Sequence, residues 1–263
     1  MSERVERISA FYGKGGEDAR LTKSRHGRLE YLTTMHYIHR FAQPGAAILE
    51  IGAGTGRYSI ALAREGYEVT AVELVEQNLA VLKQNGGALG NLHAFRGDAL
   101  DLGRFAENSF DMTLVLGPLY HLYEAEEVHR ALEEAIRVTK KGGVIFAAFL
   151  SVHAILFNNY LQGNLAAGLE ENFDEHYGVK HFEEQLFTGY DIAQFEQMIR
   201  REKVQYLTTA SADSILELAE HRSDFQMSDE EFERFAQYHL ATCEKRELLA
   251  SASHLLCLCR KMP

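Results

Sequence analysis

The chain has 263 residues and a formal net charge of −11, with 46% hydrophobic and 25% charged residues. This composition is that of an ordinary globular protein, and the length suffices for one large domain or for a core domain with a sizeable insertion. The acidic balance argues against an extended surface for nucleic acid or an anionic membrane, because phosphate binding depends on clustered Lys and Arg.

The cysteines and the apolar stretches of the chain indicate in which cellular compartment the protein is expected. The chain contains three cysteines, Cys243, Cys257 and Cys259. They form no disulfide framework, and no Cys or His pair nearby completes a metal site, so we expect a reducing compartment and no metal. The most apolar stretch, Gly142 to Phe157, carries Ser151 and His153 and is too short to span a bilayer. The N-terminus is charged from its third residue and has no apolar signal core, so we expect a cytoplasmic protein without a membrane partner.

Strand and helix signals alternate along most of the chain. Expected strands are Ala47 to Ile51, Tyr67 to Val72, Asn91 to Ala99, Phe110 to Leu116, Gly143 to Leu150 and a last one at His254 to Lys261. Expected helices between them are Ser59 to Glu65, stopped by Gly66, then Leu74 to Asn85, stopped by Gly86 and Gly87, and Glu124 to Val138. This alternation implies right-handed crossovers and a parallel sheet covered by helices on both faces.

Two segments interrupt this alternation. Residues 151–186 are rich in aromatic and amide side chains, and residues 212–249 form an acidic, helix-patterned block with a capping-box signature at Ser228 and Glu231. Both segments are expected to be insertions over the sheet edge where ligands bind in open α/β folds. They could equally be surface helices that cover apolar sheet.

A glycine-rich loop follows the first expected strand. Gly52, Gly54 and Gly56 stand at alternate positions between that strand and the next helix. Glycines there allow a tight turn and a close approach of the backbone to a ligand at the helix N-terminus. The spacing differs from the G-x-G-x-x-G fingerprint of dinucleotide-binding proteins, because Arg57 follows Gly56 directly.

This loop, with Glu50 before the first glycine, resembles motif I of the class I S-adenosylmethionine-dependent methyltransferases. The resemblance continues in chain order with Glu73 at the end of the second strand, Asp98 after the third and Leu116 at the end of the fourth. It covers roughly Gly45 to Leu150 and the final strand. A nicotinamide or flavin enzyme of related fold is the alternative.

The resemblance implies an α/β protein with a Rossmann-like, mostly parallel seven-stranded sheet, helices on both faces, and a helical lid and cap insertions. It implies S-adenosylmethionine as cofactor. In the family, the acid after the second strand binds the ribose hydroxyls, the acid after the third accepts from the adenine amino group, and a carbonyl after the fourth holds the methionine amino group. The cofactor-binding residues implied are Glu50, Gly52, Ala53, Gly54, Gly56, Glu73, Leu74, Asp98, Ala99 and Leu116.

The N-terminal segment, residues 1–43, is expected to be a helical lid on a core at residues 44–263 that carries the two insertions. Small-molecule members of the family resemble this arrangement, with a lid Tyr or Arg reaching the cofactor carboxylate. Tyr12 and Arg28 are the candidates here. Alternatively, Tyr12 packs within the lid and Arg28 is solvated. The stretch from Gly13 to Gly27 is basic and glycine-containing, so we expect it to be flexible until the cofactor engages it.

The loop after the fourth strand contains the candidate catalytic residues, Tyr120 and His121. His121 could act as a general base, and Tyr120 could orient the substrate. Alternatively, His121 caps the following helix or packs under the cofactor.

The same loop informs the substrate class. Methyltransferases that act on amino groups of nucleic-acid bases have Asp or Asn before Pro-Pro-Tyr, whereas Gly117 stands at that position and offers no acceptor. The sequence therefore predicts methyl transfer to an N, O or S atom of a small molecule, and the acidic block favours a neutral or cationic one. The alternatives are an RNA or protein methyltransferase, or a non-catalytic S-adenosylmethionine-binding protein. The sequence leaves the oligomeric state open.

Overall fold

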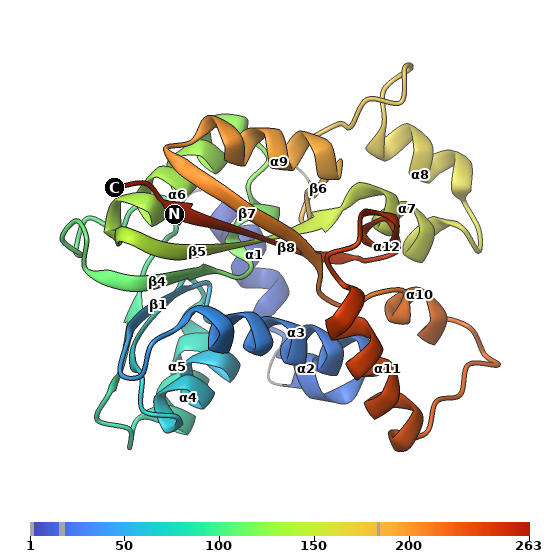
Figure 1. The fold of residues 1–263 in the computed structure, drawn as a ribbon. Coiled ribbons are helices and arrows are strands. Elements are labelled where there is room, and N and C mark those ends of the chain that lie inside the picture. The colour runs from blue at the N-terminus through green and yellow to red at the C-terminus, as the bar shows by residue number, and fades with distance from the viewer. Residues whose placement is uncertain (1–2, 16–18, 183–184) are drawn as a thin grey trace.

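A twisted sheet runs through the centre of the molecule, with helices on both of its faces (Figure 1). The structure is a computed structural model and describes residues 3–15, 19–182 and 185–263. Its strands are β1 Ala47–Ile51, β2 Glu68–Glu73, β3 Leu92–Arg96, β4 Phe110–Val115, β5 Thr139–Ser151, β6 Gly189–Tyr190, β7 Val204–Ser211 and β8 His254–Lys261. The strand order is β3-β2-β1-β4-β5-β8-β7, with the two-residue β6 paired to the end of β5.

Strands β1 to β5 are parallel, and β8 is antiparallel to both β5 and β7. The expected Rossmann-like, mostly parallel seven-stranded sheet is therefore confirmed, with the short β6 as an addition. The strand ends that matter for the site agree with the sequence, since β1 has the expected bounds and Glu73 is the last residue of β2.

The helices follow in chain order. They are α1 Glu3–Tyr12, α2 Arg20–Lys23, α3 Arg25–Phe41, α4 Arg57–Arg64, α5 Glu76–Gly86, the 3-10 turn η2 Pro118–His121, α6 Ala125–Val138, α7 Val152–Tyr160, α8 Leu165–Asn172, α9 Ile192–Arg201, α10 Leu216–Glu220, α11 Asp229–Thr242 and α12 Arg246–Leu249. None of the helices in the described ranges is both long and apolar enough to cross a membrane.

Alternating side chains of the central strands build two cores. Ile145, Ala147 and Phe149 of β5 are buried with apolar residues of α6 and α9, whereas Val144 and Phe146 are buried with those of α3 and α4. Because every second residue of a strand points to the same face, one strand supplies both layers. On β8, Cys257 and Cys259 share one face, and both are buried and free.

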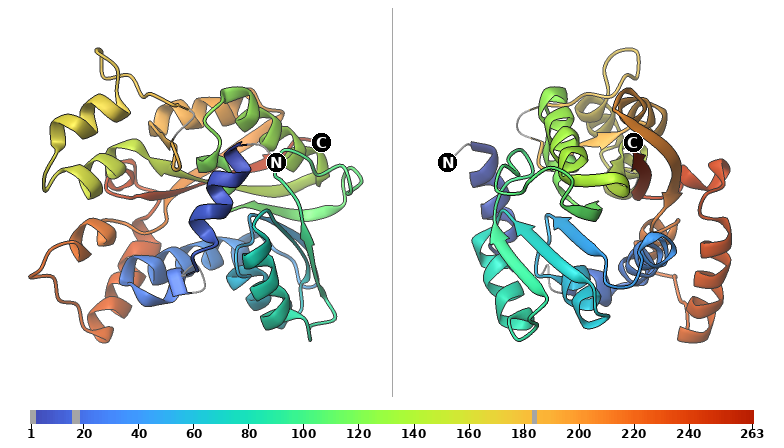
Figure 2. Two further views of the ribbon diagram at one scale, coloured as in Figure 1. Left: turned by 180° about the vertical axis from the view of Figure 1, so that it is seen from behind. Right: turned by 60° about the vertical axis from the view of Figure 1, so that its left-hand side comes forward.

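The carboxyl ends of the parallel strands define one edge of the sheet. Helices α7, α8, α10 and α11 gather beyond the end of β5 (Figure 1), and α1 crosses the far side of the molecule (Figure 2). Residues 151–186 contain α7 and α8, and residues 212–249 contain α10, α11 and α12. The expected capping box is present, since Ser228 Oγ accepts from the Glu231 backbone N–H and the Glu231 carboxylate accepts from the Ser228 backbone N–H.

Helices α1, α2 and α3 precede β1, in the segment expected to be a lid. The expected flexible stretch from Gly13 to Gly27 includes residues 16–18, which lie outside the described residues, as do residues 1–2 at the start of the lid segment. The division into a lid at residues 1–43 and a core at residues 44–263 stays a prediction.

The stacked pair Phe149 and Phe195 tests the α9-side core. Their ring centroids are 4.0 Å apart, and both side chains are completely buried. Truncation in Phe149→Ala should lower the free energy of unfolding by about 3 to 5 kcal/mol, because it removes buried apolar area and leaves a cavity. Urea denaturation measures this loss. Phe157→Ala, at a position that is 39% exposed, is the control, and an equal loss in both variants would contradict the assignment of the core.

Candidate functional site

The loops at the ends of β1, β2, β3 and β4 meet in one cavity beneath α1. The residues expected from the sequence that line it are Gly52, Gly54, Glu73, Leu74, Asp98, Ala99, Leu116, Tyr12, Tyr120 and His121. Parallel strands deliver these residues to one place because their carboxyl ends lie at the same edge of the sheet.

The glycine-rich loop is built for close approach. Gly52, Gly54 and Gly56 all have positive φ, at 78°, 56° and 89°. A Cβ on Gly52 would lie 2.6 Å from Pro118 Cδ, so only glycine lets the loop after β4 close against the loop after β1. A Cβ on Gly56 would instead lie 2.7 Å from Leu82 Cγ, so this glycine serves the packing of α4 against α5.

Three of the expected residues do not line the cavity. They are Glu50, Ala53 and Gly56. Glu50 is buried and accepts a hydrogen bond from Ser59 Oγ. Burial raises the pKa of the Glu50 carboxyl to about 8, although the hydrogen bond from Ser59 opposes this rise. Because of its position under the loop, Glu50 contributes to the loop's shape.

The Glu73 carboxylate ties β2 to the glycine-rich loop. One oxygen accepts from the Gly54 backbone N–H at 2.7 Å, and the other accepts from the Val75 backbone N–H at 2.8 Å. A carboxylate can accept about four hydrogen bonds in all, and Glu73 lines the cavity, where a ligand hydroxyl can reach it. Glu73 therefore shapes the loop and also offers acceptors to a ligand.

Polar contacts from both ends of helix α1 close the cavity. Arg4 Nη2 lies 2.6 Å from Asp98 Oδ2, and Tyr12 Oη lies 2.9 Å from His121 Nε2. The second Asp98 oxygen accepts from the Leu100 backbone N–H at 3.1 Å. Arg4 was missed in the sequence because one arginine in an N-terminal helix carries no positional signal.

His121 is locked between two partners. Its Nδ1 lies 2.7 Å from the Leu186 carbonyl oxygen, so Nδ1 carries the hydrogen and Nε2 accepts from the Tyr12 hydroxyl. Burial lowers the pKa of His121 to about 4, although the hydrogen bond to Leu186 opposes this fall. A neutral imidazole with both nitrogens engaged fits the alternative of a positioning residue better than that of a general base.

Arg28 is not where the resemblance implies. Its guanidinium lies 4.6 Å from the centroid of the Phe232 ring and 3.4 Å from Asp229 Oδ1, both on α11 and away from the cavity. Arg20 of the same basic stretch lines the cavity instead, and it forms a two-point ion pair with Glu30 at 2.7 and 3.0 Å. The sequence pattern therefore indicated the basic segment but not which of its arginines points inward.

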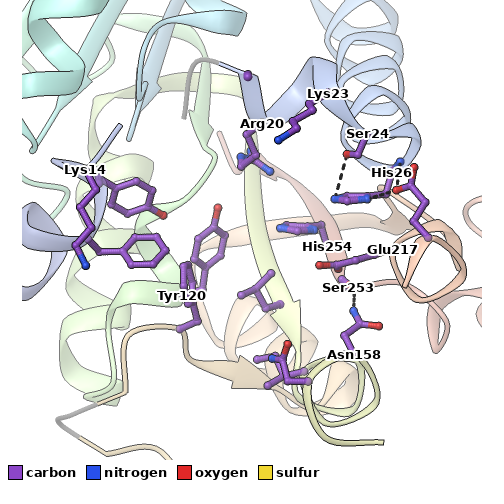
Figure 3. A pocket seen from close by; sticks show the side chains of 18 of the residues that line it. Lys14, Arg20, Lys23, Ser24, His26, Tyr120, Asn158, Glu217, Ser253 and His254 are labelled. Atoms are coloured by element: carbon purple, nitrogen blue, oxygen red, sulfur yellow. Dashed lines mark hydrogen bonds and ion pairs between the residues drawn. The ribbon is translucent and has the colours of Figure 1, made fainter. Parts of the chain in front are cut away.

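A second, larger cavity of about 980 Å³ adjoins the first (Figure 3). Tyr12, Arg20 and Tyr120 line both cavities and thus form their common boundary. Other lining residues include Lys14, Phe187, Phe11 of α1, Lys23 of α2, Asn158 of α7, Glu217 and Glu220 of α10, and His254 of β8.

The charge around the larger cavity differs from the expectation. The acidic block supplies only Glu217 and Glu220, both of α10, whereas α11 packs on α3 through Phe232. Arg20 and Lys23 of α2 add positive charge to the same lining. The charged residues in the lining are therefore mixed, and the acidic block gives no basis for a preference for cations.

Comparisons with known proteins agree with this geometry. Residues 49–147 match the family model described as a methyltransferase domain. A demethylmenaquinone methyltransferase of Renibacterium salmoninarum is 36% identical over 110 residues, which cover 42% of this chain and 44% of that protein. A demethylmenaquinone methyltransferase of Paenarthrobacter aurescens is 34% identical over 128 residues, which cover 47% and 48%. The chain thus spans less than half the length of these curated relatives.

Solved structures share the fold over a larger part of the chain. The complex between the Haloferax volcanii Trm112 methyltransferase activator and a putative methyltransferase has a TM-score of 0.60 at 18% identity, covering 100% of this chain and 99% of that one. Phosphoethanolamine N-methyltransferase 1 of Haemonchus contortus, in complex with phosphoethanolamine and S-adenosylhomocysteine, has a TM-score of 0.61 at 14% identity, covering 100% and 50%. The matched domain and the shared fold confirm the expected resemblance: residues 49–147 match a methyltransferase domain, and the sheet has the fold of the class I S-adenosylmethionine-dependent methyltransferases.

Proposed function

We propose that the protein transfers a methyl group from S-adenosylmethionine to a small molecule held in the 980 Å³ cavity. The observation that carries this proposal is the common boundary of Tyr12, Arg20 and Tyr120 between that cavity and the strand-end cavity. An acceptor on one side would meet a methyl donor on the other. The names of the demethylmenaquinone and phosphoethanolamine methyltransferases support a small-molecule acceptor.

The residues of the strand-end cavity suit the cofactor. Gly52 and Gly54 line the cavity with positive φ values, and Glu73 and Asp98 present carboxylate acceptors at the ends of β2 and β3. When bound, S-adenosylmethionine supplies a methyl group activated by a positively charged sulfur. The chain would hold the acceptor in line with that methyl and exclude water, with Tyr12 covering the site and Tyr120 forming a wall.

Two of the three alternatives fit the site less well. A methyltransferase for RNA needs a basic, open surface, whereas the chain carries a net charge of −11 and the larger cavity has the size of a metabolite site. A non-catalytic protein that binds S-adenosylmethionine would need no second cavity at the methyl-donor side. A cytoplasmic location remains part of the proposal.

Cofactor binding gives the first test. Asp98→Ala should weaken S-adenosylhomocysteine binding by about 1 to 3 kcal/mol, the cost of losing a hydrogen bond to a charged acceptor. Isothermal calorimetry measures this change. Asp111→Ala, which removes a carboxylate paired with Lys140 outside the cavity, is the matched control and should bind like the wild type. Wild-type affinity in Asp98→Ala would remove this residue from the site.

Turnover gives the second test. Purified protein with labelled S-adenosylmethionine should label a component of pooled cell metabolites and leave bulk RNA and bulk protein unlabelled. The larger cavity, at about 980 Å³, has the volume of a small-molecule site, and the acidic chain disfavours a polyanion. Labelling of RNA or protein alone would show that the substrate class is wrong.

The lid contact gives the third test. Arg4 forms an ion pair with the Asp98 carboxylate, which would have to accept the adenine amino group when the cofactor binds. The strand-end cavity, at about 80 Å³, is also smaller than ordinary ligand pockets. Arg4→Ala should therefore open α1 more readily, since the loss of about 1 kcal/mol of ion pairing corresponds to a roughly fivefold change in an opening equilibrium. Stopped-flow binding should show a faster association, and hydrogen exchange should rise at residues 3–12. Unchanged exchange and association would rule out this latch.

The state of His121 gives the fourth test. With a pKa of about 4, His121 stays neutral above pH 6, so it contributes no pH dependence of turnover between pH 6 and 9. His121→Ala should weaken cofactor binding by about 1 to 2 kcal/mol, because it removes the hydrogen bond between His121 and the Tyr12 hydroxyl of α1. Tyr12→Phe should have a similar effect, and the double variant should be less than additive. Loss of a pH-rate limb near neutrality in His121→Ala would restore the general-base role.

A further inference from the structure

The larger cavity contains a histidine that the sequence pattern did not indicate. His254 is the first residue of β8, and its ring centroid lies 6.4 Å from that of Tyr120. Leu116, Tyr120 and His254 also line one small cavity between the sheet and α3. Leu116 is expected to lie at the methionine end of the cofactor, and His254 lines the larger cavity, where the acceptor is proposed to bind, with Tyr120 beside it (Figure 3).

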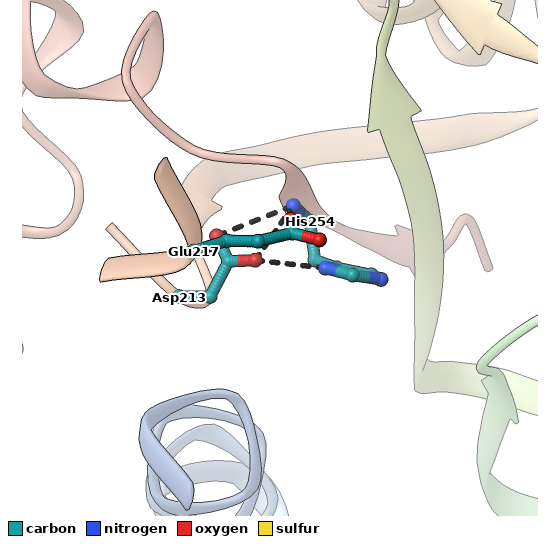
Figure 4. Close-up of side chains that lie close together, drawn as sticks. All are labelled: Asp213, Glu217 and His254. Carbon is teal, nitrogen blue, oxygen red and sulfur yellow. Dashed lines mark hydrogen bonds and ion pairs between the residues drawn. The ribbon is translucent and has the colours of Figure 1, made fainter. Parts of the chain in front are cut away.

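Asp213 fixes the orientation of this ring (Figure 4). Asp213 Oδ2 lies 2.7 Å from His254 Nδ1, and the carboxylate also accepts from the backbone N–H groups of Ser253 at 3.1 Å and His254 at 3.2 Å. Asp213 is completely buried, so this arrangement is rigid. The Nδ1–H therefore donates to Asp213, and Nε2 is the nitrogen that remains for a ligand.

Three imidazoles lie around the two cavities, and they differ in what their nitrogens contact. His121 uses both nitrogens, as described above. His26 uses Nδ1 for Glu220 and has Nε2 3.3 Å from Ser24 Oγ. Among the described residues, no side chain or backbone group forms a hydrogen bond with His254 Nε2. This nitrogen is also absent from the set of fully buried polar atoms without a hydrogen-bond partner, which means that a ligand can reach it. His254 thus has the imidazole nitrogen that is available to an acceptor molecule.

Four charged side chains lie near the His254 ring. Asp213 lies on the loop after β7, Glu217 on α10, Glu30 on α3 with an oxygen 4.0 Å from Nδ1, and Arg20 on α2 behind Glu30. Burial alone would lower the pKa of His254, but the negative charge of Glu30 and the hydrogen bond to Asp213 outweigh it and raise that pKa to about 9.

We propose that His254, held by Asp213, is the proton acceptor of the methyl transfer, and that the acceptor molecule is a phenol or enol on a flat ring. This inference rests on the proposed function. The hydroxyl proton passes to His254 Nε2, the oxygen forms a bond to the methyl carbon, and the carbon–sulfur bond breaks with its electron pair staying on sulfur. The products are a methyl ether, a neutral thioether and a protonated His254, which returns its proton to solvent.

The type of hydroxyl group follows from comparing its pKa with that of His254. A phenol has a pKa of about 10, close to the value for His254, so proton sharing between the two costs little. An aliphatic hydroxyl resembles water, with a pKa of roughly 16, and would hold its proton. Three aromatic side chains that pack against one another, Phe11, Tyr120 and Phe187, line this cavity and form a wall on which a flat ring can pack.

A metal at this place has less support. One ligand atom each from Asp213, Glu217 and His254 lies within 4.8 Å of the others. The Asp213 oxygens, however, already accept two backbone N–H groups and the imidazole N–H. The geometry is that of a carboxylate orienting a histidine.

The test uses labelled S-adenosylmethionine with three acceptor probes that share a naphthalene ring: 2-naphthol, 2-naphthylamine and the aliphatic alcohol 2-naphthalenemethanol. We expect 2-naphthol to be methylated in preference to the other two. The wild-type kcat/KM should rise about tenfold per pH unit up to about pH 9, because only neutral His254 can accept the proton. His254→Gln should lower kcat by about 10² to 10⁴-fold with unchanged S-adenosylhomocysteine affinity. Asp213→Asn should move this rise of kcat/KM to lower pH, because the variant lacks the carboxylate that raises the pKa of His254.

His26→Gln is the matched control, because it removes another carboxylate-paired histidine from the lining of the same cavity, and it should keep the limb near pH 9. Three results would overturn the inference: no methylation of 2-naphthol while cofactor still binds, a limb that persists in His254→Gln, or activity that EDTA abolishes. Each leaves the proposed function standing if metabolites are labelled. Absence of both cofactor binding and metabolite labelling would instead reject the proposed function itself.

Discussion

The carboxylate of Glu73 is the interaction on which the site depends. It accepts the backbone N–H groups of Gly54 and Val75, and so joins the loop after β1 to the loop after β2. With that loop fixed, Gly52 faces Pro118 at a distance that excludes any side chain. Pro118 opens the turn η2, which positions Tyr120 and His121. One buried acid and one glycine therefore align the ends of three strands.

The segments outside the sheet convert that aligned edge into two cavities. Helix α1 covers the strand-end cavity through Arg4 and Tyr12, while α2, α7 and α10 surround the larger one. One polar contact of α1, that of Arg4, uses a carboxylate expected to bind the cofactor. A cover held in this way can open for a ligand at modest cost, whereas the sheet beneath it is packed on both faces.

The sequence predicted the parts of the structure that local patterns determine. Strand ends and the glycine-rich loop follow from hydrophobic runs, turn residues and positive-φ requirements, so Gly52, Glu73 and Asp98 were located correctly at strand ends. The sequence could not predict which arginine faces the cavity. Arg20 and Arg28 are the same residue type in the same basic segment, and only the packing of α2 and α3 distinguishes them. His254 and Asp213 meet only through the antiparallel pairing of β7 and β8, which no spacing in the sequence encodes.

A crystal structure with S-adenosylhomocysteine is the most direct measurement of the central claim. It should show the adenosyl group between Glu73 and Asp98, with Arg4 displaced from Asp98, and the sulfur at the boundary formed by Tyr12, Arg20 and Tyr120. Density for the ligand elsewhere, with the contact between Arg4 and Asp98 intact, would contradict a methyl donor at the junction of the two cavities.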